Sequence, residues 1–170
     1  MKNLILSAFA ILILASCQEQ KIGYVDSGDV INEYQEKKDI EEKFKGKEEA
    51  FKKRADSIGK AFQFEVQKYN IEKPRMSSKS IQTKEQELSQ KQQILQQQVQ
   101  FEQQQLQQQY KVEIDSVIIK VKDFVKDYGK TNGYKYILGT SDALPSVLYG
   151  VEENDLTKTI LEALDAEYKK

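Results

Sequence analysis

Two long apolar stripes with helical spacing, separated by a single proline, constrain the fold of this chain more than any other feature of its sequence. In the first stripe, apolar residues recur mostly in steps of three, four or seven, at positions 30, 34, 40, 44, 51, 55, 58, 62, 66 and 69. The second stripe uses the same steps, at positions 81, 88, 95, 99, 106, 110, 117, 121, 124 and 128. This spacing keeps each stripe on one face of a helix. Two such helices around one turn predict an antiparallel coiled-coil hairpin arm over residues 28–130.

Pro74 marks the turn between the two helices. Proline has no backbone N–H to donate, and it disfavours helical geometry at the preceding residue, so the first helix should end there. Three serines follow closely, and we expect the turn within residues 73–80. Gly46 and Gly59 lie inside the first helix, where each costs about 1 kcal/mol relative to alanine. They predict a flexible helix that bends without ending.

The polar faces of the two helices differ in composition. Residues 28–73 carry 11 basic and 11 acidic side chains, whereas residues 90–109 contain 13 glutamines in 20 positions. Glutamine-rich sequence is compatible with disorder or β-aggregation. Here the apolar residues between the glutamines keep helical spacing, and glutamine is a good helix former. We therefore interpret residues 90–109 as an uncharged helix face.

The N-terminal residues have the order of a secretory signal peptide, which we assign to residues 1–16. A basic residue precedes an apolar run over residues 4–14. This run is shorter than the roughly 20 residues that a membrane-spanning helix needs. The sequence Leu-Ala-Ser-Cys at 14–17 resembles the lipobox of bacterial lipoproteins, whose cysteine is acylated and begins the mature chain. We expect Cys17 to be lipidated, with residues 17–21 as a short tether; the alternative is ordinary cleavage that leaves a free thiol.

Short β-forming segments bracket the hairpin. Residues 22–27 read as a strand that leads into a helix, with Ser27 or Asp29 as the capping side chain. Two further strands are predicted at residues 134–139 and 147–151, on either side of a turn that contains a proline.

Glycines stop the second long helix near residues 129–133, and a final amphipathic helix begins at Asp155 and carries apolar residues as far as Tyr168. The predicted β-rich body therefore comprises residues 22–27 and 131–170. So small a unit buries too little of its surface to be stable alone. We expect the chain to oligomerise through its strands and the bases of its arms.

The residues that most enzyme sites require are missing. The sequence has no histidine, the commonest general base, and its one cysteine lies at the N-terminus. Asp26, Asp29 and Glu33 could be imagined as a carboxylate site, but capping of a helix start explains them. The sequence Asp-Ser-Gly-Asp at 26–29 lacks the second glycine and the lysine of a phosphate-binding loop. We predict no enzyme activity, no metal and no cofactor.

The overall charge gives no indication of a nucleic-acid partner. The chain has 26 basic and 27 acidic residues, a formal net charge of −1. A strongly basic chain would be expected if phosphate contacts dominated binding.

The chain resembles the Skp/OmpH family of periplasmic chaperones over nearly all of its mature length. The resemblance rests on the opening strand Ile22–Asp26, the Phe-Lys-Gly-Lys stretch at 44–47, the hairpin length, and the strand, turn, strand and helix order from Tyr134 to Tyr168. It implies a mostly α fold with a small β-rich body that assembles into a homotrimer. It also implies that three hairpins enclose a cavity, in which unfolded outer-membrane proteins are held in the periplasm without ATP.

Two features depart from the best-known members of that family. The chain is mildly acidic where they are strongly basic, which argues against carrying over a lipopolysaccharide site. Cys17 would anchor it to a membrane, inner or outer, where they are usually free. We interpret the chain as a lipid-anchored, trimeric, ATP-independent holdase. The alternative function is a structural or adaptor coiled-coil lipoprotein of the cell envelope, which the same periodicity would serve.

Apolar side chains near the predicted tip are candidate contacts for unfolded clients. The candidates are Phe62, Phe64, Tyr69, Met76 and Phe101. Phe62 and Tyr69 lie in the first stripe, where packing inside the hairpin is the expected role. Phe64, Met76 and Phe101 lie off the stripes and are expected to be exposed.

Basic residues also gather at the predicted tip. Residues 67–84 contain five of them against the single acidic residue Glu72, a local excess of +4. The five are Lys68, Lys73, Arg75, Lys79 and Lys84. A basic tip would attract acidic clients or anionic lipid head groups. The alternative interpretation is a solvated helix end.

Overall fold

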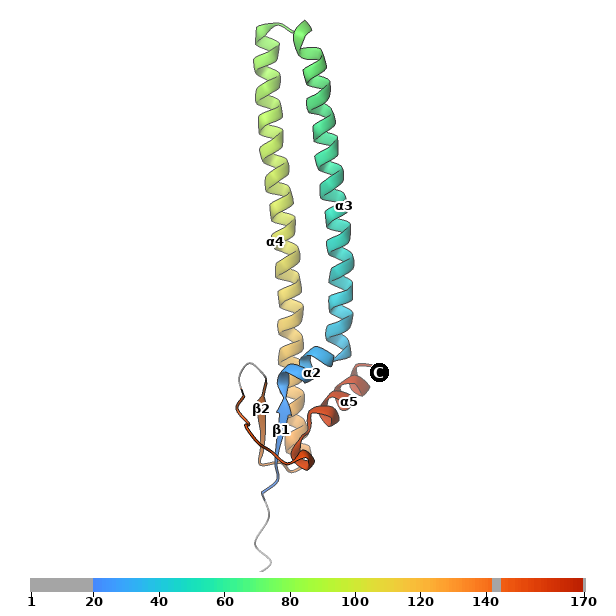
Figure 1. Ribbon diagram of the computed structural model, residues 1–170, viewed down its shortest axis with the longest axis vertical. Helices are drawn as coiled ribbons and strands as arrows, with labels where there is room; N and C mark the ends of the chain where they lie inside the picture. The colour runs from blue at the N-terminus through green and yellow to red at the C-terminus, as the bar shows by residue number, and fades with distance from the viewer. Residues whose placement is uncertain (1–19, 142–144, 170) are drawn as a thin grey trace, which may run out of the picture. The chain divides into compact units, whose positions relative to one another are not determined.

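The computed structural model describes residues 20–141 and 145–169. Its elements, in chain order, are β1 (Ile22–Asp26), α2 (Ser27–Glu33), α3 (Gln35–Glu72), the 3₁₀ helix η1 (Lys73–Arg75), α4 (Ser78–Thr131), β2 (Tyr136–Thr140), the 3₁₀ helix η2 (Glu152–Asn154) and α5 (Thr157–Tyr168) (Figure 1). They form two compact units. The hairpin unit is residues 35–117, and the terminal unit is made of the described residues of 1–34 and 118–170.

Two long helices joined by a tight turn make up the hairpin unit. Figure 1 shows α3 and α4 side by side, connected at one end through η1. The helix α3 ends at Glu72, and α4 begins at Ser78, so the turn falls where Pro74 predicted it. Gly46 and Gly59 lie inside α3 without interrupting it. The mostly α fold class predicted from the sequence is therefore confirmed.

The predicted stripes form the apolar seam between helices. Every position of the first stripe is buried or half-buried, and so is every position of the second except Tyr110. The Tyr110 ring still packs edge-on against the Phe44 ring, with centroids 5.4 Å apart. Phe44, Tyr69, Leu88 and Val117 are the buried residues of the seam within the hairpin unit. Apolar burial along this seam is the main stabilising contribution that the sequence pattern provides.

Cross-helix ion pairs fix the register of the hairpin. Lys43 pairs with Glu113, Arg54 with Glu102, and Glu65 with Lys91. Successive pairs are eleven residues apart on both helices. The stripes follow the same period, since positions 40, 51 and 62 and positions 88, 99, 110 and 121 are buried or lie at the seam. An eleven-residue repeat has 3.67 residues per turn, which is closer to the 3.6 of a straight helix than the 3.5 of the heptad repeat in a left-handed coiled coil.

The terminal unit contains a two-stranded parallel sheet within the described residues. Strand β1 pairs with β2 in a register that runs from Ile22 opposite Tyr136 to Asp26 opposite Thr140. Parallel neighbours need a crossover connection, and here the whole hairpin is that connection. Helix α4 ends at Thr131, and Gly133 adopts φ = +73°, a left-handed conformation that suits glycine at a helix C-terminus.

The core of the terminal unit lies between its short helices and β1. Its most buried side chains are Val25, Val30, Tyr34, Val121, Leu156, Ile160 and Leu164. The Tyr34 ring packs edge-on against Tyr168, with centroids 6.0 Å apart. This contact links the C-terminal end of α2 to the last residue of α5.

Three local predictions were wrong. The first long helix does not start at residue 28 as one piece, because Tyr34 has extended geometry (ψ 127°) and separates α2 from α3. Neither Ser27 nor Asp29 caps α2; the Asp26 side chain accepts a hydrogen bond of 2.9 Å from the Asp29 N–H. Residues 147–151 run as irregular chain and not as a strand.

The geometry around Tyr24 explains the missing strand. The Leu156 N–H donates a 2.8 Å hydrogen bond to the Tyr24 carbonyl, so the edge of β1 away from β2 is already occupied there. Gly150 lies so close to the Tyr24 ring that a Cβ at this position would clash with it. The chain passes across β1 at this point and cannot form a ladder with it.

Candidate functional site

The tip of the hairpin unit is held by a hydrogen-bonded cluster of three side chains. The Tyr69 hydroxyl donates a 2.8 Å hydrogen bond to Glu85 Oε1, and Lys73 Nζ donates a 2.7 Å hydrogen bond to the same oxygen. Lys73 also lies over the Tyr69 ring, 5.5 Å from its centroid. The position of Tyr69 in the seam agrees with its predicted packing role, and it leaves little of this side chain for a ligand.

The cluster shifts the proton affinities of all three groups. Hydrogen bonds from Lys73 and Tyr69 lower the pKa of Glu85, and the hydrogen bond to Glu85 raises the pKa of Lys73. Burial of the ring raises the pKa of Tyr69, and the hydrogen bond to Glu85 adds to this effect. The three groups therefore keep a cation, an anion and a neutral hydroxyl over a wide range of pH.

Most basic residues of the predicted tip lie beside carboxylates. Lys73 pairs with Glu85, Lys68 approaches Glu72 at 4.0 Å, and Lys84 lies between Glu87 at 3.2 Å and Glu65 at 3.6 Å. The hydrogen bond to Glu87 raises the pKa of Lys84. These contacts draw in acidic residues from outside the segment 67–84.

Arg75 and Lys79 are the basic tip residues without an ion pair to the part of the chain that the structure describes. Counted over residues 65–87, five basic side chains face four acidic ones, a local excess of +1. The charge available to a partner at the tip is thus much smaller than the +4 counted from the sequence of residues 67–84.

Four of the five apolar candidates divide as the stripes predicted, but Met76, which was expected to be exposed, is half-buried. Phe64 and Phe101 expose 70% and 60% of their surface, whereas Phe62 and Met76 are half-buried. Three exposed apolar residues of the hairpin unit were not predicted: Ile71, Ile94 and Val112. The signal that could have found them is the one that found Phe64, since each is a large apolar residue at a position that neither stripe occupies.

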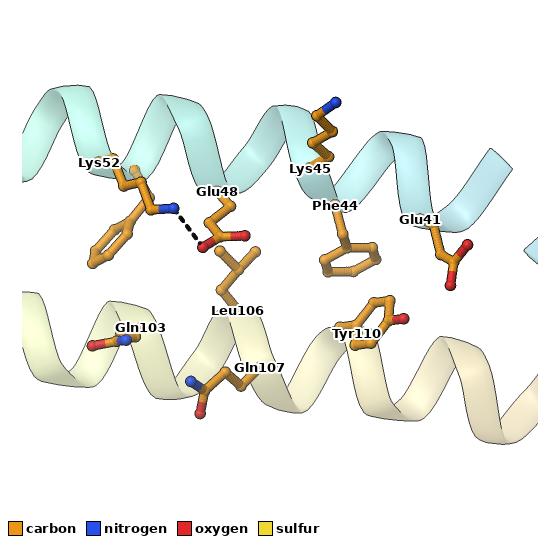
Figure 2. A pocket seen from close by; sticks show the side chains of 10 residues that line it. Glu41, Phe44, Lys45, Glu48, Lys52, Gln103, Leu106, Gln107 and Tyr110 are labelled. Carbon is orange, nitrogen blue, oxygen red and sulfur yellow. Dashed lines mark ion pairs between the residues drawn. The ribbon is translucent and has the colours of Figure 1, made fainter. Parts of the chain in front are cut away.

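A groove between α3 and α4 was also not predicted. It has a volume of about 370 Å³. Its apolar lining consists of Phe44, Phe51, Leu106 and Tyr110, and its polar lining of Glu41, Lys45, Glu48, Lys52, Gln103 and Gln107. Figure 2 shows the Phe44 and Tyr110 rings facing each other from the two helices, with Leu106 beside them. Lys45 points away from α4, and Lys52 pairs with Glu48 at 2.8 Å.

A second hollow between α3 and α4 shares Phe51 and Leu106 with the first groove. It contains the Arg54 and Glu102 ion pair and Lys47, which donates a 3.4 Å hydrogen bond to Gln109. Polar pairs thus connect α3 to α4 across the second hollow, whereas the only ion pair drawn in the groove of Figure 2 lies within α3. Neither hollow encloses a ligand-sized space away from solvent in the manner of an enzyme site.

The terminal unit has its own exposed apolar side chains. Tyr136 and Leu138 lie on β2, whose second edge has no strand partner among the described residues. Leu148 and Tyr149, on the irregular segment that follows, expose 89% and 86% of their surface. Exposed sheet edges and apolar patches of this kind are typical of association surfaces.

Two further kinds of feature were sought in the described residues, a metal-binding cluster and a membrane-spanning helix. Within residues 20–141 and 145–169, no group of three His, Cys, Asp or Glu side chains is arranged to hold a metal ion. None of the helices in these ranges is both long and apolar enough to cross a membrane. Cys17, the predicted lipidation site, lies outside the described residues.

Comparison with known proteins gives a family match and a match to a solved structure. Residues 21–164 match the family model described as "Outer membrane protein (OmpH-like)". The fold is similar to the crystal structure of an OmpH-like outer membrane chaperone candidate from Caulobacter crescentus CB15, with a TM-score of 0.77 and 14% sequence identity. That similarity covers 88% of this chain and 86% of the other. Among curated proteins, none matches this sequence.

Proposed function

Since the chain belongs to the OmpH-like family of outer membrane proteins, we propose that it is an ATP-independent holdase, which keeps unfolded outer-membrane proteins from aggregating in the periplasm. The observation that carries the proposal is the form of the exposed apolar surface on the hairpin unit. Large apolar side chains are scattered singly along both helices and are not gathered in one shaped pocket. A surface of this kind favours weak contact with many sequences over tight binding of one ligand.

The exposed residues are the proposed client contacts. Phe64 on α3 and Phe101 on α4 are the predicted candidates with the most exposed surface. Phe62 and Met76 keep part of their surface accessible, whereas Tyr69 contributes chiefly through its hydrogen bond to Glu85. Arg75 and Lys79 are the proposed positions for long-range attraction of acidic clients or lipid head groups, assisted by Lys68, Lys73 and Lys84 despite their carboxylate neighbours.

The proposal includes a homotrimer. The unpaired edge of β2 and the exposed Leu148 and Tyr149 support association through the terminal unit. Three chains would then place three hairpins around one client. Light scattering on the mature chain should give about three times the monomer mass, and a stable monomer would rule out a client cavity between hairpins.

The proposal also includes a lipid anchor on Cys17. Residues 17–21 would then connect the acylated cysteine to β1, and extended chain spans at most about 3.5 Å per residue. So short a tether would hold the terminal unit close to a membrane surface. Replacing Cys17 with serine beneath an ordinary signal peptide tests this point. Loss of client protection in cells is expected, and undiminished protection would show that the anchor is incidental.

The holdase activity itself is tested with a urea-unfolded outer-membrane β-barrel protein. When it is diluted into buffer with a several-fold molar excess of the mature chain and no nucleotide, light scattering should stay low. Unchanged aggregation would refute the proposal. A pull-down from the periplasm separates the adaptor alternative, because one stoichiometric folded partner would favour an adaptor, whereas many unfolded barrel proteins would favour the holdase.

A further inference from the structure

Between Lys91 and Lys111, the outward face of α4 carries no charged side chain, unlike the rest of the hairpin unit. Three exposed apolar residues, Ile94, Phe101 and Val112, follow one another at spacings of seven and eleven residues. Both spacings return to nearly the same side of a helix with 3.6 residues per turn. Gln97, Gln104 and Gln108 lie between them on the same side and are exposed. We call these six residues the uncharged face of α4.

The register of the hairpin allows a comparison with α3 at the same height. The contacts of Lys47 with Gln109 and of Glu65 with Lys91 place residues 47–64 of α3 opposite residues 92–109 of α4. Eight of these 18 residues of α3 are charged, but in α4 only Glu102 is. Glu102 is paired with Arg54 across the hairpin. The outer surface of α4 is therefore uncharged over roughly 27 Å at 1.5 Å per residue.

We infer that this uncharged face of α4 is the surface on which the hairpin holds unfolded polypeptide, specifically segments rich in apolar side chains and poor in charge. The inference rests on the proposed holdase function and assigns its client-binding surface. Ile94, Phe101 and Val112 contact apolar client side chains. The glutamine side chains exchange hydrogen bonds with the client backbone.

Complementarity of charge and hydrogen bonding supports this assignment. An unfolded segment presents unpaired backbone N–H and C=O groups, and each glutamine offers both a donor and an acceptor. Covering a charged side chain with an apolar segment costs far more free energy than covering an amide that keeps its hydrogen bonds. The outer surface of α3, with Glu49, Lys53 and Lys60 exposed, would incur that cost. The uncharged face of α4 would not incur this desolvation cost.

Two matched triple variants test the inference. Gln97→Glu, Gln104→Glu and Gln108→Glu together place three carboxylates on the uncharged face. Ala50→Glu, Ser57→Glu and Ala61→Glu place three carboxylates on α3, at the same spacings, at similar height and also at exposed positions. A third variant carries Gln→Lys at the same three positions of α4. Circular dichroism and melting establish that each variant is folded, as exposed helical positions predict.

The readout is the molar excess needed to suppress aggregation of a urea-unfolded outer-membrane β-barrel protein on dilution. Both α4 variants should require a several-fold greater excess, and the α3 variant should behave as the parent chain. If the α3 variant loses as much protection as the α4 variants, or neither α4 variant loses any, the inference fails while the holdase function stands. If only one sign of charge weakens protection, client charge and not an uncharged surface determines binding.

Two further outcomes distinguish failure of the holdase function, and self-association of the chain, from client binding on the uncharged face. A parent chain that gives no protection refutes the holdase function itself, independently of the variants. A change of oligomeric mass in the α4 variants, measured by light scattering, would show that this face associates with a second copy of the chain and would overturn the inference. Unchanged mass together with lost protection supports it.

Discussion

Arg54 of α3 forms an ion pair with Glu102 of α4, and moving eleven residues along both helices leads to the next cross-helix pair in either direction. Those neighbours are Lys43 with Glu113 and Glu65 with Lys91. Eleven residues complete three turns at 3.67 residues per turn, close to the period of a straight helix. The polar pairs and the apolar seam thus specify the same register, which excludes slipped alignments of the two helices.

The Arg54 and Glu102 pair should contribute modestly to this register. Arg54→Glu should lower the free energy of unfolding by about 0.2–1 kcal/mol, the usual range for exposed pairs. Adding Glu102→Arg should restore most of the loss, because the swapped pair keeps the interaction. Urea unfolding of the three chains measures this. Lys53→Glu, at an exposed position without an ion pair among the described residues, controls for net charge and should not be rescued by Glu102→Arg.

The glycines inside α3 should limit the stability of the hairpin unit. Gly46→Ala and Gly59→Ala should each raise the free energy of unfolding by about 0.5–1 kcal/mol, since alanine has the higher helix propensity. A Cβ at either position meets no atom within 4 Å. Gly23→Ala is the contrasting control, because its Cβ would lie 2.5 Å from Leu156 Cδ1. Thermal melting should rank the first two above the parent and Gly23→Ala below it.

The range of unfolded clients that the chain holds is a second measurement for the Gly46 and Gly59 variants. If flexibility helps the hairpins to fit different clients, the chain with both glycines replaced should hold a narrower range of unfolded barrel proteins. An unchanged melting temperature together with an unchanged client range would remove any role for these glycines.

The hairpin could be predicted from sequence because its cause is local and repetitive. Stripe residues such as Phe44 and Leu88 recur at helical spacing, and Pro74 excludes helix at one point. The break at Tyr34 could not be predicted in this way. Tyr34 keeps the spacing of the stripe and is fully buried, but it lies in the terminal unit against Tyr168, more than a hundred residues away in sequence.

The missing strand has the same kind of explanation. Residues 147–151 have strand-forming composition, but a strand requires a free partner edge, and Leu156 already bonds to Tyr24 there.

The groove and the charge neutralisation at the tip also depend on distant residues. Glu85 pairs with Lys73 only because the turn folds α4 back on α3. Composition counts of residues 67–84 therefore overstate the basic charge at the tip.

The tip cluster should make the stability of the hairpin depend on pH. The pKa of Glu85 is held below its ordinary value of 4.5, so its contribution is present above that value and is lost as pH falls through the lower folded pKa. Urea midpoints measured from neutral to acidic pH should fall in this range. Glu85→Gln should flatten part of the fall. Glu49→Gln, an exposed position without an ion pair in the described parts of the chain, should leave the profile as in the parent.

The exposed pair Leu148 and Tyr149 should be required for assembly if the trimer forms through the terminal unit. These adjacent side chains are almost fully exposed in a single chain, a state that burial against a neighbouring copy would relieve at about 25 cal/mol per Å² of apolar surface. Leu148→Ser with Tyr149→Ser should therefore shift the mass measured by light scattering from trimer toward monomer, in a concentration-dependent way. Ile71→Ser, which removes an apolar side chain of the hairpin unit that is 77% exposed, should leave the mass unchanged. If Ile71→Ser dissociates the trimer and the double variant does not, assembly runs through the hairpins, and three hairpins could not surround a client.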